Sequence, residues 1–249
     1  MNILAINGSP RGKRSNTDKI LLPFLEGAAG AGASTELLYV KDLDVNPCQG
    51  CFNCHMKTPG RCIFQDDMPG VLEKMKAAEI LVFAAPLYVF SVPAQFKAFL
   101  DRLMVLGDLK LDFVDGIVVH PPRWTDIQWK WVVISNAGFP EPEHFQPMLD
   151  MYRRFARAIG GGAYVTLSAD ICKGMGELLA NKPLLPQFEW FFEACRQAGA
   201  EMVRDGQVSE ATRAVLDRPL LDVTPREFAD MANFYIEKAA RLIREKQGD

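Results

Sequence analysis

The sequence predicts an α/β fold built on an open parallel sheet, because short apolar runs alternate with helix-like segments along the chain. Five of these runs are expected to be strands, at residues 2–7, 35–40, 79–85, 129–135 and 163–167. Their nearly continuous apolar character is typical of parallel strands that are covered on both faces. We therefore expect right-handed helical crossovers between neighbouring strands.

Apolar residues at helical spacing predict the helices that lie between these strands and after them. They are expected at residues 15–29, 71–78, 93–106, 144–159, 186–200, 209–216 and 224–246. Asp66 and Asp67 are expected to cap the second of these helices, and Thr224 with Glu227 predicts a capping box for the last. The long segment 107–128 interrupts the pattern, and segments of this kind are often lids or binding loops.

No linker or internal repeat divides the chain, so we expect one domain over residues 1–249. Within it, a cysteine-rich loop covers residues 46–65, and a helical C-terminal extension runs from about 186 to 249. The extension is expected to cover an edge of the sheet or to contact a second copy of the chain.

The overall composition is that of a globular protein, with 49% hydrophobic and 24% charged residues among 249. A formal charge of −3 argues against a general nucleic-acid or membrane-surface binder. No apolar run approaches the roughly 20 residues that a membrane span needs. Met1 leads directly into the first strand without a basic leader, so we expect a protein of the reducing cytoplasm.

A turn suited to an anion follows the first strand, in the segment Asn7-Gly-Ser-Pro-Arg-Gly-Lys-Arg-Ser-Asn-Thr17. A loop rich in hydroxyls and backbone N–H groups at a helix start is a favourable place for a phosphate. The turn lacks the glycine patterns for a dinucleotide or a nucleoside triphosphate. It therefore predicts a site for a single phosphomonoester, although the same residues could simply turn the chain and cap the helix.

Two further loops end in groups that would suit a flat ring. The third strand leads into Pro86-Leu-Tyr-Val-Phe90, and the fourth leads into Asn136-Ala-Gly138. Apolar groups at the carboxyl end of a strand can pack against a planar heterocycle, and Gly138 would let backbone amides approach its polar edge. Since the carboxyl ends of parallel strands meet at one sheet edge, the three loops together favour a ribityl-phosphate flavin.

Four cysteines gather within one short segment, as Cys48-x2-Cys51-x2-Cys54-x7-Cys62. Two overlapping C-x2-C steps are typical of a loop that wraps an iron–sulfur cluster. Zinc ligation and free or catalytic thiols remain open alternatives. His55 adjoins Cys54 as a competing ligand, but we expect it to be a solvated loop histidine.

These motifs resemble the flavodoxin-fold NAD(P)H-dependent FMN reductases. The likeness covers residues 1–168 and rests on the turn at 7–17, on Ala85-Pro-Leu-Tyr-x4-Pro-Ala94 and on Lys97 with Asp101-Arg102. The cysteine run followed by Asp66-Asp-Met68 is similar to the iron–sulfur flavoprotein branch of that family. Residues 169–249 match nothing as well.

The resemblance implies a flavodoxin-like three-layer fold with sheet order 2-1-3-4-5. It implies that FMN phosphate binds at Ser9, Ser15, Asn16 and Thr17, with Arg11 as an additional contact. Ring contacts are implied at Pro86, Leu87, Tyr88, Val89, Phe90, Asn136, Ala137 and Gly138. In the branch with clusters, Cys48, Cys51, Cys54 and Cys62 carry a [4Fe–4S] centre, and the assembly is a homodimer or homotetramer.

The resulting functional prediction is an FMN-dependent NAD(P)H oxidoreductase that passes electrons to a small-molecule acceptor. The cofactor carries such chemistry, and no side chain is expected to act as a catalytic acid or base. A first alternative is an iron–sulfur flavoprotein that exchanges electrons with a ferredoxin-like partner. A second alternative is a non-redox binding module stabilised by zinc.

Overall fold

In the part of the chain that the structure describes, the central sheet has five parallel strands in the order β2-β1-β3-β6-β7. The computed structural model describes residues 1–114, 116–159 and 164–247. The sheet strands are β1 (Asn2–Asn7), β2 (Ser34–Tyr39), β3 (Ile80–Pro86), β6 (Trp129–Asn136) and β7 (Val165–Lys173). Counted among themselves, these strands have the order 2-1-3-4-5, so the predicted fold class is confirmed.

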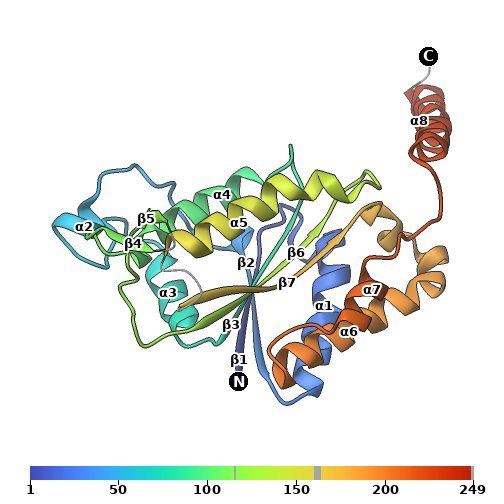
Figure 1. Cartoon of the computed structure of the whole chain (residues 1–249). Coiled ribbons are helices and arrows are strands. Elements are labelled where there is room, and N and C mark those ends of the chain that lie inside the picture. The colour runs from blue at the N-terminus through green and yellow to red at the C-terminus, as the bar shows by residue number, and fades with distance from the viewer. Residues whose placement is uncertain (115, 160–163, 248–249) are drawn as a thin grey trace.

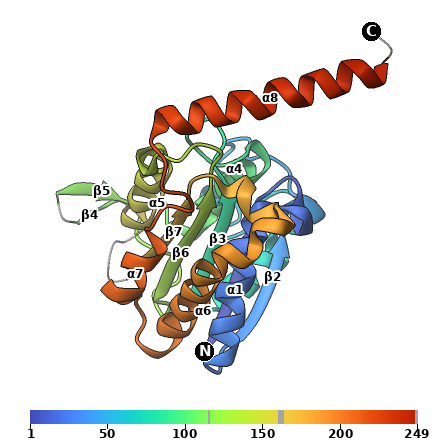
Figure 2. The ribbon, with the colours of Figure 1, turned by 90° about the vertical axis from the view of Figure 1, so that its right-hand side faces the viewer.

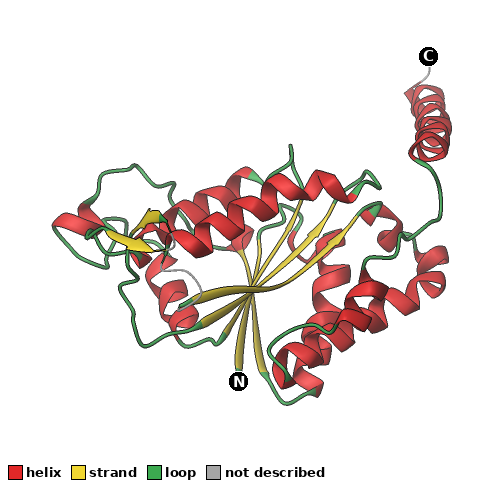
Figure 3. Ribbon diagram, in the orientation of Figure 1, coloured by secondary structure: helices red, strands yellow, loops and turns green. Residues whose placement is uncertain are grey.

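Helices cover both faces of the sheet (Figure 1, Figure 3). One face carries α1 (Asn16–Gly30), α6 (Glu189–Arg204) and α7 (Glu210–Leu216), and the other carries α3 (Met68–Lys76), α4 (Ala94–Asp101) and α5 (Gln146–Ala158). The short α2 (Asn53–Met56) lies in the cysteine loop, and α8 (Pro225–Gln247) closes the chain. The 3-10 segments are Gly12–Arg14, Val40–Asp42, Arg102–Leu106, Pro142–Phe145, Gly176–Ala180 and Lys182–Phe188.

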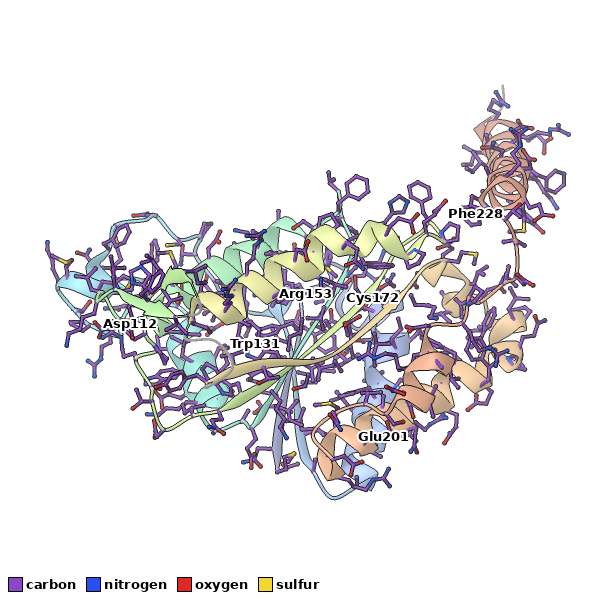
Figure 4. The ribbon with its side chains drawn as sticks, viewed as in Figure 1. Asp112, Trp131, Arg153, Cys172, Glu201 and Phe228 are labelled. Carbon is purple, nitrogen blue, oxygen red and sulfur yellow. The ribbon has the colours of Figure 1, made fainter. Side chains whose placement is uncertain are left out.

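Alternate residues of the strands build two separate apolar layers. In β1, Leu4 and Ile6 face the layer under α3, α4 and α5, whereas Ile3 and Ala5 face the layer under α1 and α6. Trp131 of β6, labelled in Figure 4, is fully buried and its ring lies 5.0 Å from that of Phe83. The continuous apolar runs in the sequence therefore correspond to strands buried on both sides.

Helices α1 and α6 cross at very short range because two glycines lie at the contact. A Cβ atom on Gly199 would lie 1.9 Å from the carbonyl oxygen of Phe24, and one on Gly27 would lie 1.8 Å from that of Arg196. Only a residue without a side chain fits either position. Helix α6 is therefore packed against α1, the first helix of the chain.

We expect Gly199→Ala to lower the free energy of unfolding by about 2 kcal/mol, because the methyl group forces the two helices apart. Gly30→Ala is the matched control, since no heavy atom lies within 4 Å of its added Cβ. Urea unfolding of both variants measures the difference. If residues 1–249 form one domain, as we propose, both should unfold in a single transition.

Two segments differ from the sequence predictions. The fifth sheet strand was predicted at 163–167 but is observed at Val165–Lys173, and residue 163 lies outside the described residues. Its burial alternates along the strand, as expected at a sheet edge, so the apolar run was too short to reveal it. The segment 107–128 contains an antiparallel pair, β4 (Asp112–Val114) and β5 (Ile117–Val119).

The last helix stands away from the rest of the chain (Figure 1, Figure 2). Its predicted capping box is confirmed, since the Glu227 carboxylate accepts from the N–H of Thr224 and the Thr224 hydroxyl accepts from the N–H of Glu227. Among the described helices, including this one, none combines the length and apolar character needed to cross a membrane.

Candidate functional site

A pocket of about 170 Å³ lies at the carboxyl ends of the strands and gathers most of the predicted site residues. It is lined by Ser9, Arg11, Ser15, Asn16, Thr17, Pro86, Leu87, Tyr88, Asn136, Ala137, Gly138 and Glu177. These residues come from the ends of β1, β3, β6 and β7 and from the start of α1. Parallel strands thus bring three loops that are distant in sequence to one edge of the sheet.

The turn after β1 is held by its own hydrogen bonds. The side chain of Asn7 accepts from the N–H of Ser9 at 2.8 Å and donates to Asp18 at 2.6 Å. Burial raises the pKa of Asp18, even though Tyr39 and Asn7 both donate hydrogen bonds to its carboxylate. These bonds fix the direction in which the chain enters α1.

The start of α1 presents backbone donors to the pocket. Ser15 is the N-cap, and its hydroxyl accepts from the N–H of Asp18 at 3.2 Å. The other N–H groups of a first helical turn have no acceptor within the helix, which leaves those of Asn16 and Thr17 for a ligand. Arg11 adds an exposed guanidinium, so this end of the pocket suits an anion.

A side-chain hydrogen bond connects the start of α1 to the opposite wall of the pocket. The buried Thr17 hydroxyl donates to Asn136 at 2.8 Å, which links α1 to the end of β6. Behind Asn136 lies Gly176, where an added Cβ would come within 2.7 Å of the Cβ of Asn136. A side chain at position 176 would therefore collide with Asn136, and glycine lets the chain after β7 pass close behind the end of β6.

Glu177 is the pocket residue that the sequence analysis missed. Its carboxylate lies 4.0 Å from the position that a Cβ on Gly138 would take, and burial raises its pKa. The signal that could have found it is the glycine-rich bend Lys173-Gly-Met-Gly176, which follows the edge strand directly.

The loop after β3 makes a very tight turn at the pocket mouth. The backbone groups of Tyr88 and Ser91 exchange hydrogen bonds of 2.8 and 2.9 Å. The two residues between them, Val89 and Phe90, both have positive φ, at 48° and 61°. Tyr88 lines the pocket, whereas Val89 and Phe90, which were predicted as ring contacts, do not line it.

We expect Val89→Gly to stabilise the protein by about 1 kcal/mol, because a β-branched residue in the left-handed region is strained. Val89 is 92% exposed, so little packing is lost on replacement. Val118→Gly is the control, since that exposed valine lies in the extended strand β5 and should lose stability on replacement. Thermal unfolding measures both, and a destabilised Val89→Gly protein would contradict the assignment of strain.

The four clustered cysteines line a second, small cavity of about 20 Å³. Its other walls include Phe52, Phe64 and Met104, so the sulfurs face a largely apolar space. Burial raises the pKa of the Cys54 thiol, and the charges of Cys62, Cys48 and Cys51 raise it further. The loop therefore brings Cys48, Cys51, Cys54 and Cys62 together, as predicted from their spacing.

Among the residues that the structure describes, no three His, Cys, Asp or Glu side chains are placed to hold one metal ion. A tetrahedral zinc site needs its ligands around a single ion, whereas the ligands of a cluster bind different irons. The prediction that His55 is solvated is wrong, because it is only 8% exposed and its ring lies 6.1 Å from that of His120.

A buried ion pair closes the cysteine loop. Arg102 and Asp66 have side chains that are 1% and 0% exposed, and a second Arg102 nitrogen donates to Asp66 at 3.0 Å. Arg102 also donates to the carbonyl of Asn46 at 2.8 Å, so it joins the two ends of the loop. Asp66 accepts from the N–H of Met68, the first residue of α3, at 3.2 Å. The side chain of Asp67, which was also predicted to cap this helix, makes no capping hydrogen bond.

The N-terminal part of the chain is similar to a known protein family. Residues 1–117 match the family model of the NADPH-dependent FMN reductases. These residues, which make up slightly less than half of the chain, are similar to that family. The match includes the turn after β1, the cysteine loop and the loop after β3, and it ends before β6.

Curated relatives match a similar part of the chain. An iron–sulfur flavoprotein of Methanosarcina thermophila is 40% identical over 106 residues, which cover 43% of this chain and 54% of that protein. An FMN-dependent NADH:quinone oxidoreductase of Bradyrhizobium diazoefficiens is 29% identical over 114 residues, covering 43% of this chain and 56% of the relative. The chain thus spans about half the length of the curated relatives that it matches.

Solved structures share the fold over a longer stretch. An NAD(P)H:quinone oxidoreductase from Methanothermobacter marburgensis has a TM-score of 0.56 and 18% identity, and the alignment covers 81% of this chain and 96% of that one. At this identity, the likeness shows the flavodoxin-like fold.

Proposed function

We propose that the protein is an FMN-dependent NAD(P)H oxidoreductase that reduces a quinone-type or other small-molecule acceptor. The observation that carries this proposal is the pocket at the strand ends, where hydrogen-bond donors suited to an anion lie beside apolar loops. The FMN reductase match over residues 1–117 and the quinone oxidoreductase relative support the same activity.

The residues present fit FMN. The hydroxyls of Ser9 and Ser15, the backbone N–H groups of Asn16 and Thr17 and the guanidinium of Arg11 would hold the phosphate. Pro86 and Leu87 would contact the ring. The volume is smaller than that of cavities which enclose a whole ligand of this size, so part of the ring would remain exposed. An exposed ring face leaves room for the second substrate.

When bound, FMN would supply the redox chemistry by accepting a hydride from the reduced nicotinamide and passing electrons to the acceptor. The protein would position the reactants. Tyr88, held by the tight turn, would contact the ring at the mouth, and the amides after β6 would approach its polar edge. Glu177, whose pKa is raised by burial, would lie near that edge.

The experiment is an anaerobic reduction assay on the FMN-loaded protein. We expect NADPH or NADH to bleach the visible absorption of the flavin, and menadione to restore it. Bound FMN that neither nicotinamide reduces would contradict the proposed activity while leaving the proposed FMN site intact.

A second candidate function is electron transfer through a [4Fe–4S] cluster to a ferredoxin-like protein. The observation that favours it is the convergence of four cysteines on one apolar cavity, and the curated iron–sulfur flavoprotein relatives support it. Anaerobic reconstitution with iron and sulfide, followed by metal analysis, tests the cluster. About four irons per chain are expected, and one zinc per chain without iron would contradict it.

We further propose that the protein acts as a homo-oligomer in the reducing cytoplasm. Six cysteines are free in the described structure, which fits a compartment where thiols persist. A homodimer or homotetramer is expected from the family resemblance. Mass measurement in solution tests the assembly.

A further inference from the structure

We infer that a large cavity beside the cysteine loop is a second ligand site, which binds a planar aromatic acid. The cavity has a volume of about 940 Å³, compared with about 170 Å³ for the pocket at the strand ends. Volumes of about 300–1,000 Å³ are typical of small-molecule sites. The two sites share no lining residue, so a ligand in this cavity would leave the strand-end pocket free.

The walls of this cavity come from the cysteine loop, α3, the segment Arg102–Leu106 and the segment 107–128. Figure 1 shows α3 and the loop that carries α2 at one end of the molecule. Cys62 and Phe64 line both this cavity and the small one that the four cysteines share. A ligand bound here would therefore contact the cysteine loop beside its sulfur atoms.

Aromatic rings and arginines on these walls define the class of ligand. Phe64 comes from the cysteine loop and Trp124 from the segment 107–128, and both side chains are half-buried. Arg61 and Arg123 come from the same two segments. Rings offer flat apolar surface, and guanidinium groups bind carboxylates through paired N–H donors. A planar aromatic acid matches both kinds of group.

The accessible charge on the walls is positive. Arg61 is exposed and forms no ion pair with any residue that the structure describes. Of the two acids on the walls, Glu73 is exposed, whereas the carboxylate of Asp66 is inaccessible and bound to Arg102. Two arginines, Arg61 and Arg123, thus face one accessible carboxylate.

Arg123 is fixed by its neighbours. Its guanidinium donates to the carbonyl of Gly107 at 3.0 Å and lies 3.2 Å from the carboxylate of Asp108. A Cβ atom on Gly60 would lie 3.1 Å from the Cδ of Arg123, so the cysteine loop packs directly on this side chain. Because Asp108 offsets much of its charge, Arg61 is the group that we expect to bind the carboxylate of the ligand.

Gly70 keeps part of this space open. It is the third residue of α3, and glycine is less favourable than alanine within a helix. No heavy atom lies within 4 Å of an added Cβ atom, and its φ is not positive, so neither a neighbour nor a turn requires glycine here. Gly70 does line the cavity. A longer side chain at this position would enter the space that a ligand needs.

The first test is a calorimetric titration of the FMN-loaded protein with 2-naphthoate and, separately, with 2-naphthamide. We expect 2-naphthoate to bind at one site per chain. The amide has the same rings without the charge and should bind at least about tenfold more weakly. Flavin-free protein should give the same result, which separates this site from the proposed activity. No binding of 2-naphthoate, or equal binding of the two probes, would overturn the proposal.

Arg61→Ala tests the residue assigned to the carboxylate. It should weaken 2-naphthoate at least about tenfold, because it removes a charge-assisted contact. Lys57→Ala is the matched control, since Lys57 is an exposed lysine of the same loop and does not line the cavity. Its affinity for 2-naphthoate should equal that of the parent protein. Equal affinities for Arg61→Ala and Lys57→Ala would contradict the assignment.

Gly70→Trp tests the location of the bound probe. The indole should fill part of the cavity and abolish binding of 2-naphthoate, whereas Gly70→Ala, whose methyl group is small, should retain it. Both variants replace glycine within a helix where no atom lies near the added Cβ, so both should fold. Unchanged binding to Gly70→Trp would place the probe elsewhere and overturn the proposal.

Discussion

Replacing Arg102 by alanine is expected to lower the free energy of unfolding by about 3–5 kcal/mol, because it leaves the carboxylate of Asp66 buried without its cation. Both side chains of this pair are almost completely inaccessible. The loss should be concentrated in the cysteine loop, since Arg102 also holds the carbonyl of Asn46 at the other end of that loop. Urea unfolding and hydrogen exchange over residues 46–66 measure the two effects.

Arg153→Ala is the matched control. Arg153 pairs with Asp150 at 2.9 Å on the surface of α5, and the side chains are 47% and 59% exposed. Exposed pairs of this kind contribute about 0–1 kcal/mol. Replacing both members of the buried pair, as in Arg102→Met with Asp66→Leu, should recover much of the lost stability. Equal losses for Arg102→Ala and Arg153→Ala would contradict the role of the buried pair.

The same pair predicts a pH dependence. Burial alone would raise the pKa of Asp66, but hydrogen bonds from Arg102 and from the backbone of Asn46 and Met68 outweigh it and lower the pKa to about 2. Because the folded pKa is below the ordinary value of 3.8, the contribution is present above that value and is lost as the pH falls toward 2. We expect about 2 kcal/mol to disappear over this range in the parent protein and not in Arg102→Met/Asp66→Leu.

Asn16→Glu is expected to weaken FMN binding by at least about a hundredfold without destabilising the protein. Asn16 is the first residue of α1, where a negative charge is favourable to the helix. It also lines the anion end of the pocket, where a carboxylate would repel the FMN phosphate. Two like charges about 4 Å apart near a protein surface repel by roughly 4 kcal/mol, which exceeds the energy of a hundredfold change.

Asn16→Gln, which lengthens the side chain without adding charge, is the control for size. Its affinity for FMN should fall much less than that of Asn16→Glu. Riboflavin, which lacks the phosphate, should bind to Asn16→Glu about as well as to the parent protein. If Asn16→Glu binds FMN as tightly as Asn16→Gln does, the phosphate lies elsewhere.

The sheet and most of the pocket could be predicted because both depend on local patterns. Continuous apolar runs mark buried parallel strands, and the loops that follow them must meet at one sheet edge. Ser15, Tyr88 and Asn136 could therefore be assigned to one site although they are far apart in sequence. The bounds of the edge strand β7 were harder to predict, because only one of its faces is well covered and its apolar residues alternate with polar ones.

Other features depend on contacts that no local pattern carries. His55 is buried because His120, from the segment 107–128, lies over the cysteine loop. The partner of Arg102 is 36 residues away in sequence, and an arginine within a helix-like segment gives no sign of burial. The left-handed backbone of Val89 and Phe90 opposes the usual preferences of both residues, so it could be found only in the structure.

The most direct measurement of the central claim is a calorimetric titration of flavin-free protein with FMN and, separately, with riboflavin. If the turn after β1 holds the phosphate, FMN should bind at one site per chain and at least about tenfold more tightly than riboflavin, since one charge-assisted contact is worth about 1.5–3 kcal/mol. Equal affinities for the two flavins, or no binding of FMN, would contradict the assignment of this pocket.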